Sequence, residues 1–325
     1  MDVCPFHTNP DAPPMTKAIS VIGGGISGLS CAVLLQEAGF RVSLVTDKPI
    51  FETTAAAAGA QWFPFHAGEH PRTMQWAQMT FDWCQRMMGN PDMGIAMLES
   101  IERYRTAPVV PDIIRALPSF RELDAAELPK NISYGYSALM PFMQSRKLLS
   151  YLAKKFEATG GATTFRKVES LSEETSQADL VINCSGLGAR ELCHDDTLVP
   201  AKGHVVVVAN PGLRDCCVTD YLADSFTHIF TVGDICIIGG IYQEGNSDLT
   251  PDPRITEDIL KRVAILEPAL KNAQVLSIRT GLRPVRPMIR LEAEGTVIHN
   301  YGHGGSGFTL SYGCASDVVA LAKKL

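Results

Sequence analysis

The spacing of hydrophobic and polar residues predicts a chain in which strands and helices alternate. Residues 18–22 form a short apolar strand, three glycines follow, and residues 26–38 continue as a helix. Gly39 is suited to end that helix, and residues 41–45 form a second apolar strand. A strand, a helix and a strand in this order are typical of a parallel sheet.

The remainder of the chain shows the same alternation with longer interruptions. Hydrophobic spacing predicts further helices at residues 72–88, 147–159, 260–270 and 315–324, and strands at 180–184, 205–208 and 235–238. Segments typical of a dinucleotide-binding domain lie in three separate stretches, with strand-rich segments between them. We therefore expect an α/β fold in which a Rossmann-like domain is interleaved with a smaller mixed-sheet domain.

Approximate domain boundaries follow from this division. Residues 1–17 form an N-terminal extension that we expect to be flexible. The dinucleotide-binding domain comprises 18–61, 147–199 and 281–325, and the substrate-binding domain comprises 62–146 and 200–280.

Composition narrows the class of protein. The chain has 325 residues, 46% of them hydrophobic, and a net charge of −6, which describes a globular protein and argues against nucleic-acid binding. No apolar run approaches the ~20 residues of a membrane helix. We expect a cytoplasmic protein; the C-terminal Lys323-Lys324-Leu325 is similar to a peroxisomal address and leaves that alternative open.

The turn after the first strand has the glycine spacing of a phosphate-binding loop. Gly23, Gly25 and Gly28 fit GxGxxG between a strand and a helix, and Asp47 follows Gly28 by 19 residues. In such a loop the helix N-terminus faces a pyrophosphate and the acid binds ribose hydroxyls. The pattern predicts a dinucleotide site, and by itself it does not separate NAD from FAD.

A second glycine cluster lies near the C-terminus, at residues 304–307, just before the last predicted helix. Two such clusters at opposite ends of the chain suggest contact with one long ligand that carries a reactive ring. FAD has that form, whereas an NAD-dependent dehydrogenase would leave the second cluster without a role.

Residues 279–290 contain four arginines and two prolines, which favour an extended segment. In an extended chain Arg279 and Arg283 share one face, and Arg286 and Arg290 share the other. Some of these arginines should pair with acids such as Glu292. A guanidinium holds a carboxylate with two parallel hydrogen bonds, and Arg283 is our candidate for that role.

Residues 66–70 match the HxxEH zinc motif. Zinc binding by this motif requires both histidines on one face of a helix, and Pro64, Gly68 and Pro71 oppose a helix there. We therefore expect no metal.

Together these features resemble the D-amino-acid oxidase family, which includes D-aspartate oxidase. The resemblance rests on VINCSGLGARELCHDD from Val181, RTGLRPVRPMIRLE from Arg279 and VIHNYGHGGSGFTL from Val297. It extends over nearly the whole chain. It implies non-covalently bound FAD in a split dinucleotide-binding domain, with a sheet-rich domain covering the flavin.

The resemblance also implies roles for individual residues. Arg283 would bind the substrate carboxylate, and the backbone carbonyl of Gly305 would accept a hydrogen bond from the substrate amine. The implied FAD contacts are Gly23, Gly25, Ile26, Ser27, Gly28, Asp47, Lys48, Thr53, Thr54, Gly59, Gln61, Val168, Ser185, Gly186, Gly304, Gly305, Gly307, Phe308 and Thr309.

The chain departs from the family pattern in the predicted substrate site. Counting back from Gly239 places Asp224 and His228 where broadly active members have two tyrosines. Ser306 also replaces a commonly bulky residue. We keep Arg283, Gly305 and His228 as candidate catalytic residues, and we add Asp224 and Ser306 as candidate substrate contacts.

The resemblance implies oxidation of a small D-amino acid to a 2-oxo acid, ammonia and hydrogen peroxide, with molecular oxygen as the second substrate. Hydride would leave the α-carbon for flavin N5, and positioning supplies most of the rate gain. Two alternatives remain: an oxidase of a glycine-like or N-substituted amine, and a flavin-binding protein without turnover. A homodimer is also compatible with the sequence.

Overall fold

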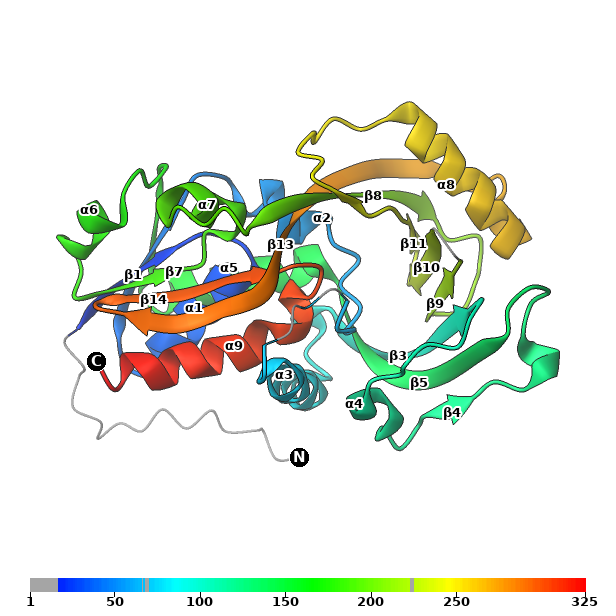
Figure 1. Cartoon of the computed structure of the whole chain (residues 1–325), viewed down its shortest axis with the longest axis horizontal. Coiled ribbons are helices and arrows are strands. Elements are labelled where there is room, and N and C mark those ends of the chain that lie inside the picture. Colours follow the sequence, from blue (N-terminus) through cyan, green and yellow to red (C-terminus); the bar gives the residue numbers. More distant parts are fainter. Residues whose placement is uncertain (1–16, 66, 68–69, 223–224) are drawn as a thin grey trace.

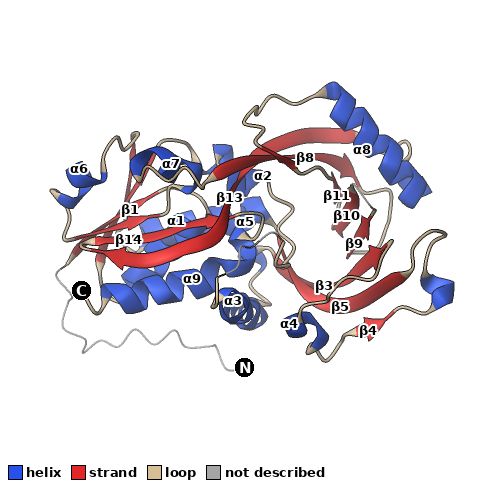
Figure 2. Cartoon of the chain, viewed as in Figure 1, coloured by secondary structure: helices blue, strands red, loops and turns tan. Residues whose placement is uncertain are grey.

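The computed structural model describes residues 17–65, 67, 70–222 and 225–325. Within these residues the strands join into one 14-stranded sheet, in the order β4-β5-β3-β9-β10-β11-β8-β13-β14-β7-β1-β2-β6, with β12 paired to β8. The sheet has a flatter half covered by helices and a strongly curved half, and long strands connect the two (Figures 1 and 2). This is the mixed α/β architecture that the sequence predicts.

The flatter half is a parallel sheet. Its strands are β1 (Ala18–Ile22), β2 (Arg41–Thr46), β6 (Ala162–Phe165), β7 (Leu180–Asn183) and β14 (Val297–His303). β1 pairs in parallel with both β2 and β7, and β14 pairs in parallel with β7. Because parallel strands need crossover connections, this half is built from segments that are far apart in the sequence.

Helices pack on this parallel sheet and bury its apolar side chains. They are α1 (Ile26–Glu37), α3 (Thr73–Met87), α5 (Ser145–Ala158) and α9 (Gly307–Ala322), with the short α2 (Thr54–Ala57), α6 (Leu171–Thr175) and α7 (Ala189–Leu192) around them. The predicted α1, α3 and α5 are confirmed to within two residues.

The last helix differs from its prediction, because α9 begins eight residues before the expected start at Ala315. Glycine and serine in that stretch have low helix propensity, which concealed the helix in the sequence. Packing compensates: a side chain on Gly313 would collide with the backbone of Trp76, so this glycine permits close contact between α9 and α3.

The curved half is mostly antiparallel. Its strands are β3 (Ile95–Tyr104), β4 (Arg121–Glu122), β5 (Tyr134–Met143), β8 (Val199–Ala209), β9 (Cys216–Tyr221), β10 (Phe226–Val232), β11 (Ile235–Gly239), β12 (Gln243–Glu244) and β13 (Val275–Glu294). The short α4 (Asp112–Arg115) lies beside β5, and α8 (Pro253–Leu266) covers the outer face of β8, β10 and β11.

Helix α8 starts earlier than the predicted 260–270 segment. Its N-terminus has Pro253 at the first helical position, and the Asp252 carboxylate accepts a hydrogen bond from Arg254 N at 2.8 Å. These are ordinary helix-start signals that hydrophobic spacing alone did not include.

Two long strands, β8 and β13, pass from one half to the other. The expected boundaries near residues 200 and 281 fall inside them, so the division into two domains stays a prediction. In the part of the chain that the structure describes, no helix is both long and apolar enough to cross a membrane.

Candidate active site

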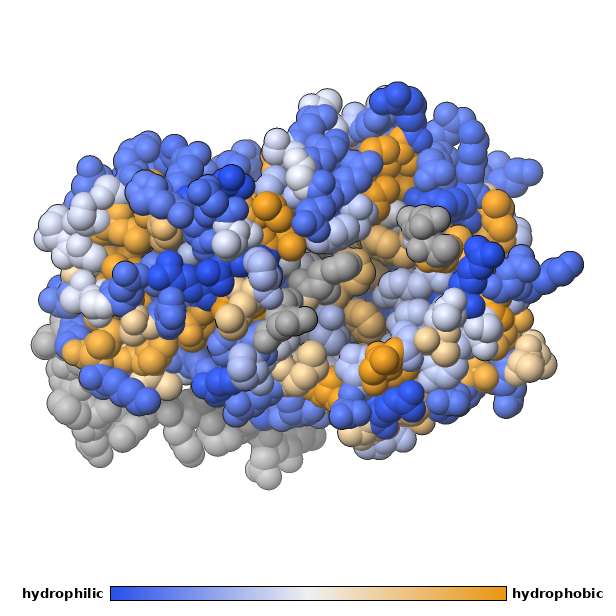
Figure 3. All heavy atoms as spheres, in the orientation of Figure 1, coloured by the Kyte–Doolittle hydropathy of each residue, from blue (hydrophilic) through white to orange (hydrophobic). Residues whose placement is uncertain are grey.

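A cleft of about 450 Å³ lies between the two halves. Its lining comes from the glycine turn after β1, from α2, from the loop before α9 and from the inner face of the curved sheet. Figure 3 shows a hollow just right of the centre of this face, between the two halves. Both glycine clusters therefore line the same cavity, as the sequence predicts.

The first glycine turn forms one end of the cleft. Gly23 has a φ of +107°, and a side chain there would collide with the carbonyl oxygen of Cys184. A Cβ on Gly24 would lie 2.8 Å from Thr46 Oγ1. Behind the turn, α1 begins at Ile26 without a side-chain cap, so its first N–H groups face the cleft.

The second glycine cluster brings another helix N-terminus to the same cavity. α9 also begins without a side-chain cap, and Gly307 lies close to Ile26 at the start of α1. Gly304 has a φ of +54°, and its N–H donates to Pro284 O at 2.9 Å. This bond fixes the glycine loop beside the residue that follows Arg283.

Most of the predicted cofactor residues line this cleft: Gly23, Gly25, Ile26, Ser27, Asp47, Lys48, Thr53, Thr54, Gly59, Gln61, Val168, Ser185, Gly186, Gly304, Gly305, Gly307 and Phe308. Gly28 lies behind the turn, where a side chain would collide with Gly23 O. It therefore serves the close packing of helix on strand.

Two of the other predicted residues do not line the cleft as expected. Thr309 is buried, and its hydroxyl exchanges hydrogen bonds with the backbone of Phe63. Ser306 is fully buried, and its hydroxyl donates to Phe65 O at 2.9 Å. Asp224 lies outside the described residues.

The cavity fits a dinucleotide. Two uncapped helix N-termini provide N–H groups for phosphate, and the glycines leave space for close approach to the backbone. Asp47 follows β2 and lines the same cleft, at the position where an acid binds ribose hydroxyls.

At the curved-sheet end, Arg283 is a half-buried cation that lines the cleft. Its Nη1 donates to the carbonyl oxygens of Lys202 and Ile241, both at 3.2 Å, and the rings of Phe65 and Tyr242 lie 5.9 and 5.7 Å from its guanidinium carbon. A Cβ on Gly203 would lie 2.9 Å from the guanidinium nitrogens, so only glycine leaves this space. Burial lowers the pKa of Arg283 to about 10, and the Tyr242 phenol opposes that shift.

The other arginines of this strand have the arrangement that the sequence predicts. Arg279 also lines the cleft. On the opposite face, Arg286 Nε donates to Asp195 at 2.8 Å and Arg290 Nε donates to Glu292 at 2.7 Å. Among the acids that the structure describes, none forms an ion pair with Arg283, so its charge is available to a ligand.

His228 lines the cleft from β10 and is buried between two aromatic rings. Its ring centroid is 4.4 Å from that of Phe230 and 6.0 Å from that of Phe226. Its Nε2 has no hydrogen-bond partner among the described residues. Burial, together with Arg283 and Arg262, lowers the pKa of His228 to about 3, so the ring is neutral near pH 7. Titration of His228 is therefore not expected to produce a pH dependence near neutrality.

Two residues that the sequence analysis did not identify belong to this region. His303 lines the cleft, with Nδ1 3.5 Å from Ser27 Oγ and Nε2 3.0 Å from Asn300 Oδ1. Its position directly before the second glycine cluster could have identified His303 from the sequence as a residue of the site. Glu102 is fully buried on β3, behind Gln61. The only indication of Glu102 in the sequence was an acidic residue at a position where the alternation of side chains along a strand places it toward the interior.

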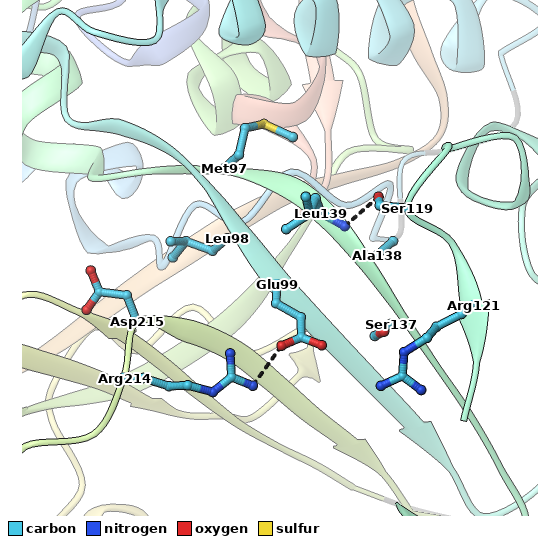
Figure 4. Close-up of a pocket in the computed structure, with 10 residues that line it drawn as sticks. All are labelled: Met97, Leu98, Glu99, Ser119, Arg121, Ser137, Ala138, Leu139, Arg214 and Asp215. Carbon is cyan, nitrogen blue, oxygen red and sulfur yellow. Dashed lines mark hydrogen bonds and ion pairs between the residues drawn. The ribbon is translucent and has the colours of Figure 1, made fainter. Parts of the chain in front are cut away.

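A second hollow lies on the outer face of β3 and β5 (Figure 4). Its two arginines are already paired: Arg214 binds Glu99 at 2.7 Å, and Arg121 binds Glu127 through two hydrogen bonds of 2.8 Å. Neither arginine of this hollow is therefore unpaired, in contrast to Arg283 in the cleft.

Comparison with known proteins agrees with this geometry. The model of the FAD dependent oxidoreductase family matches residues 18–321. A D-amino-acid oxidase from Rubrobacter xylanophilus is 41% identical over 93% of this chain and 94% of its own length, and human D-aspartate oxidase is 30% identical over 95% of both. The solved glycine oxidase from Geobacillus kaustophilus shares the fold, with a TM-score of 0.80 at 18% identity over 95% of each chain. The chain belongs to the D-amino-acid oxidase family of FAD-dependent oxidoreductases.

Proposed function

We propose that this enzyme oxidises a D-amino acid to the 2-oxo acid and ammonia, with oxygen reduced to hydrogen peroxide. The observation that carries the proposal is the Arg283 guanidinium, which lines the cleft, is held by two carbonyl oxygens and has no acid of the described chain as an ion-pair partner. The relatives named D-amino-acid oxidase support a D-amino acid as substrate.

Arg283 would bind the substrate carboxylate with two charge-assisted hydrogen bonds. Its guanidinium is already held by two carbonyl oxygens, so little side-chain freedom is lost on binding. The hydrogen bond from Gly304 N to Pro284 O fixes the adjacent Gly305 relative to Arg283. The Gly305 carbonyl would then accept a hydrogen bond from the substrate amine and orient the α-carbon.

FAD would lie along the glycine turn and α9, where it supplies the hydride acceptor and the reaction with oxygen. The residues proposed to hold it are those of the predicted set that line the cleft, except Gln61, whose side-chain amide donates to Ser100 and Glu102. The neutral His228 would contribute hydrogen bonding at the substrate carboxylate, without charge.

The test is the visible spectrum of the purified protein under anaerobic conditions. We expect a flavin spectrum that D-alanine bleaches, and hydrogen peroxide production once oxygen is admitted. Glycine and sarcosine are the comparison substrates. Faster bleaching by either of them would favour the alternative of a glycine-like substrate, and a protein without flavin would contradict both functions.

A further inference from the structure

The inner face of the curved sheet contains a buried carboxyl group that the proposed chemistry does not use. Glu102 on β3 is fully buried. Its Oε1 accepts hydrogen bonds from Gln61 Nε2 at 2.7 Å and from Ser100 Oγ at 3.2 Å. Its Oε2 makes no hydrogen bond of normal geometry to any described residue. Buried polar atoms without a partner are rare and call for an explanation.

Strand register places Glu102 on the same face as His228. Glu102 pairs with Thr219 on β9, and Thr219 pairs with His228 on β10. With strands ~4.8 Å apart, the two backbone positions are roughly 10 Å from each other. Thr219 and Gln61 both line the cleft, so the cleft extends from Arg283 past His228 to the residues in front of Glu102.

No cation in the described chain faces this carboxyl group. Its neighbours are polar or aromatic but uncharged: Gln61, Ser100 and Tyr104, Tyr136 from β5, and Thr219 and Tyr221 from β9. Arg103 follows Glu102 but binds Asp220 at 2.6 Å on the other face of the strand. Burial raises the pKa of Glu102 to about 7, although polar contacts with Gln61, Ser100, Tyr221 and Thr219 partly oppose this.

The Glu102 site also orients Gln61. Gln61 Nε2 donates to Ser100 Oγ and to Glu102 Oε1, which uses both of its N–H groups. Since Gln61 lines the cleft, its carbonyl oxygen is the group left to accept a hydrogen bond from a ligand. The rest of this end is largely apolar, with Phe63 and Phe230 in the lining.

We propose that Gln61 and Glu102 select D-amino acids whose side chain ends in a hydrogen-bond donor, an ammonium group above all. This inference rests on the proposed function and names the substrate class of the same site. The Gln61 carbonyl oxygen accepts the hydrogen bond, and the Glu102 carboxylate behind it supplies the negative charge that a buried cation needs.

The test compares D-lysine with D-norleucine, which has a similar carbon chain and no side-chain amine. We expect kcat/KM for D-lysine to exceed that for D-norleucine above pH 7. Glu102→Gln removes the charge and should reduce this ratio by about 10- to 100-fold, as for the loss of a charged hydrogen-bond partner. The matched control is Glu99→Gln on the same strand, because Glu99 faces the outer side and binds Arg214 (Figure 4).

The pH dependence gives a second readout that a merely structural role would not produce. Because only the ionised form of Glu102 supplies this negative charge, the D-lysine to D-norleucine ratio should rise as pH increases through about 7. Both substrates share the α-amino group and Arg283, so other titrations cancel in the ratio. The rise should disappear in Glu102→Gln and persist in Glu99→Gln.

A preference for D-norleucine in the unmodified enzyme, or an unchanged ratio in Glu102→Gln, would overturn the inference while oxidation of D-norleucine still supports the proposed function. Absence of turnover with D-norleucine, D-lysine and D-alanine would instead contradict the proposed function.

If Glu102→Gln does not retain flavin, Gln61→Met serves the same purpose, since it keeps the size of the side chain and removes its acceptor. It should lower the same ratio, and an unchanged ratio there would equally overturn the inference.

Discussion

The two ends of the cleft are built in different ways. At the cofactor end, glycine-rich turns at residues 23–25 and 304–307 place the N-termini of α1 and α9 at the cavity. At the substrate end the lining is made of side chains from neighbouring strands, among them Arg283 on β13 and His228 on β10.

This difference has a consequence for function. Backbone N–H groups suit a ligand that is the same in every turnover, since every residue type except proline carries one and glycine lets the turn adopt the required conformation. Side chains on a rigid sheet can change one at a time and alter the substrate without altering the fold. We therefore expect substitutions at the two ends to separate flavin binding from substrate selection.

The largest effect is expected at Arg283. Arg283→Lys keeps the charge and loses the paired hydrogen bonds, so kcat/KM for D-alanine should fall roughly 100- to 1000-fold while the flavin spectrum is retained. Arg254→Lys is the control, because Arg254 is exposed on α8 and is not part of the cleft lining. An unchanged kcat/KM for Arg283→Lys would contradict the proposed carboxylate site.

The next largest effect is expected on FAD binding at the cofactor end of the cleft. Gly23→Ala introduces a Cβ against Cys184 O at a φ of +107°, and we expect FAD to bind about 10- to 100-fold more weakly. Gly39→Ala is the matched control, because Gly39 has a φ of +91° and no atom within 4 Å of the added Cβ. Titration of apoprotein with FAD measures both. Equal weakening in the two variants would show that backbone strain alone, and not the cleft, is responsible.

The cofactor end was also the easier end to predict from sequence. The strand, the glycine turn, α1 and β2 are consecutive, and their signals are local spacing and glycine identity. The division of the arginines of β13 between two faces also followed from strand alternation alone, and Arg286 and Arg290 have the acidic partners that it requires.

The substrate end depends on contacts between residues that are distant in sequence. Glu102 faces Thr219 only because β3 pairs with β9, and no local pattern indicates that pairing. Ser306 follows a recognisable glycine cluster, yet its hydroxyl binds Phe65 O, more than 200 residues earlier in the chain. Such partners are determined by the three-dimensional packing, which sequence spacing does not contain.

A smaller effect is expected at His228. His228→Phe keeps the stacking with Phe226 and Phe230 but removes the ring nitrogens, so KM for D-alanine should rise about 2- to 10-fold. Because the pKa of His228 is lowered to about 3, kcat/KM of the two proteins should change in parallel between pH 5.5 and 8. A step near pH 6.5 that disappears in His228→Phe would show that this histidine is charged during turnover.

The smallest effect on catalysis is expected at Asp195, which anchors β13 outside the cleft. Burial opposes ionisation of Asp195, but hydrogen bonds from Thr197, Arg286 and Tyr301 outweigh it and lower its pKa to about 2. Because the pKa of Asp195 is lower in the folded protein than in the unfolded chain, its ionisation stabilises the fold. This contribution is complete at pH values above the unfolded-state pKa of about 4, and it is lost as the pH falls toward 2.

Asp195→Asn should therefore lower the free energy of unfolding by about 2 kcal/mol at pH 7, with kcat/KM unchanged. Denaturation at several pH values measures the difference, which should shrink below pH 4. Asp196→Asn is the adjacent control, since Asp196 is exposed and its contact with Arg190 is 3.4 Å long. A fall in kcat/KM for Asp195→Asn at full flavin content would mean that the ion pair of Arg286 on one face of β13 affects the position of Arg283 on the other face. Substrate binding would then depend on contacts outside the cleft.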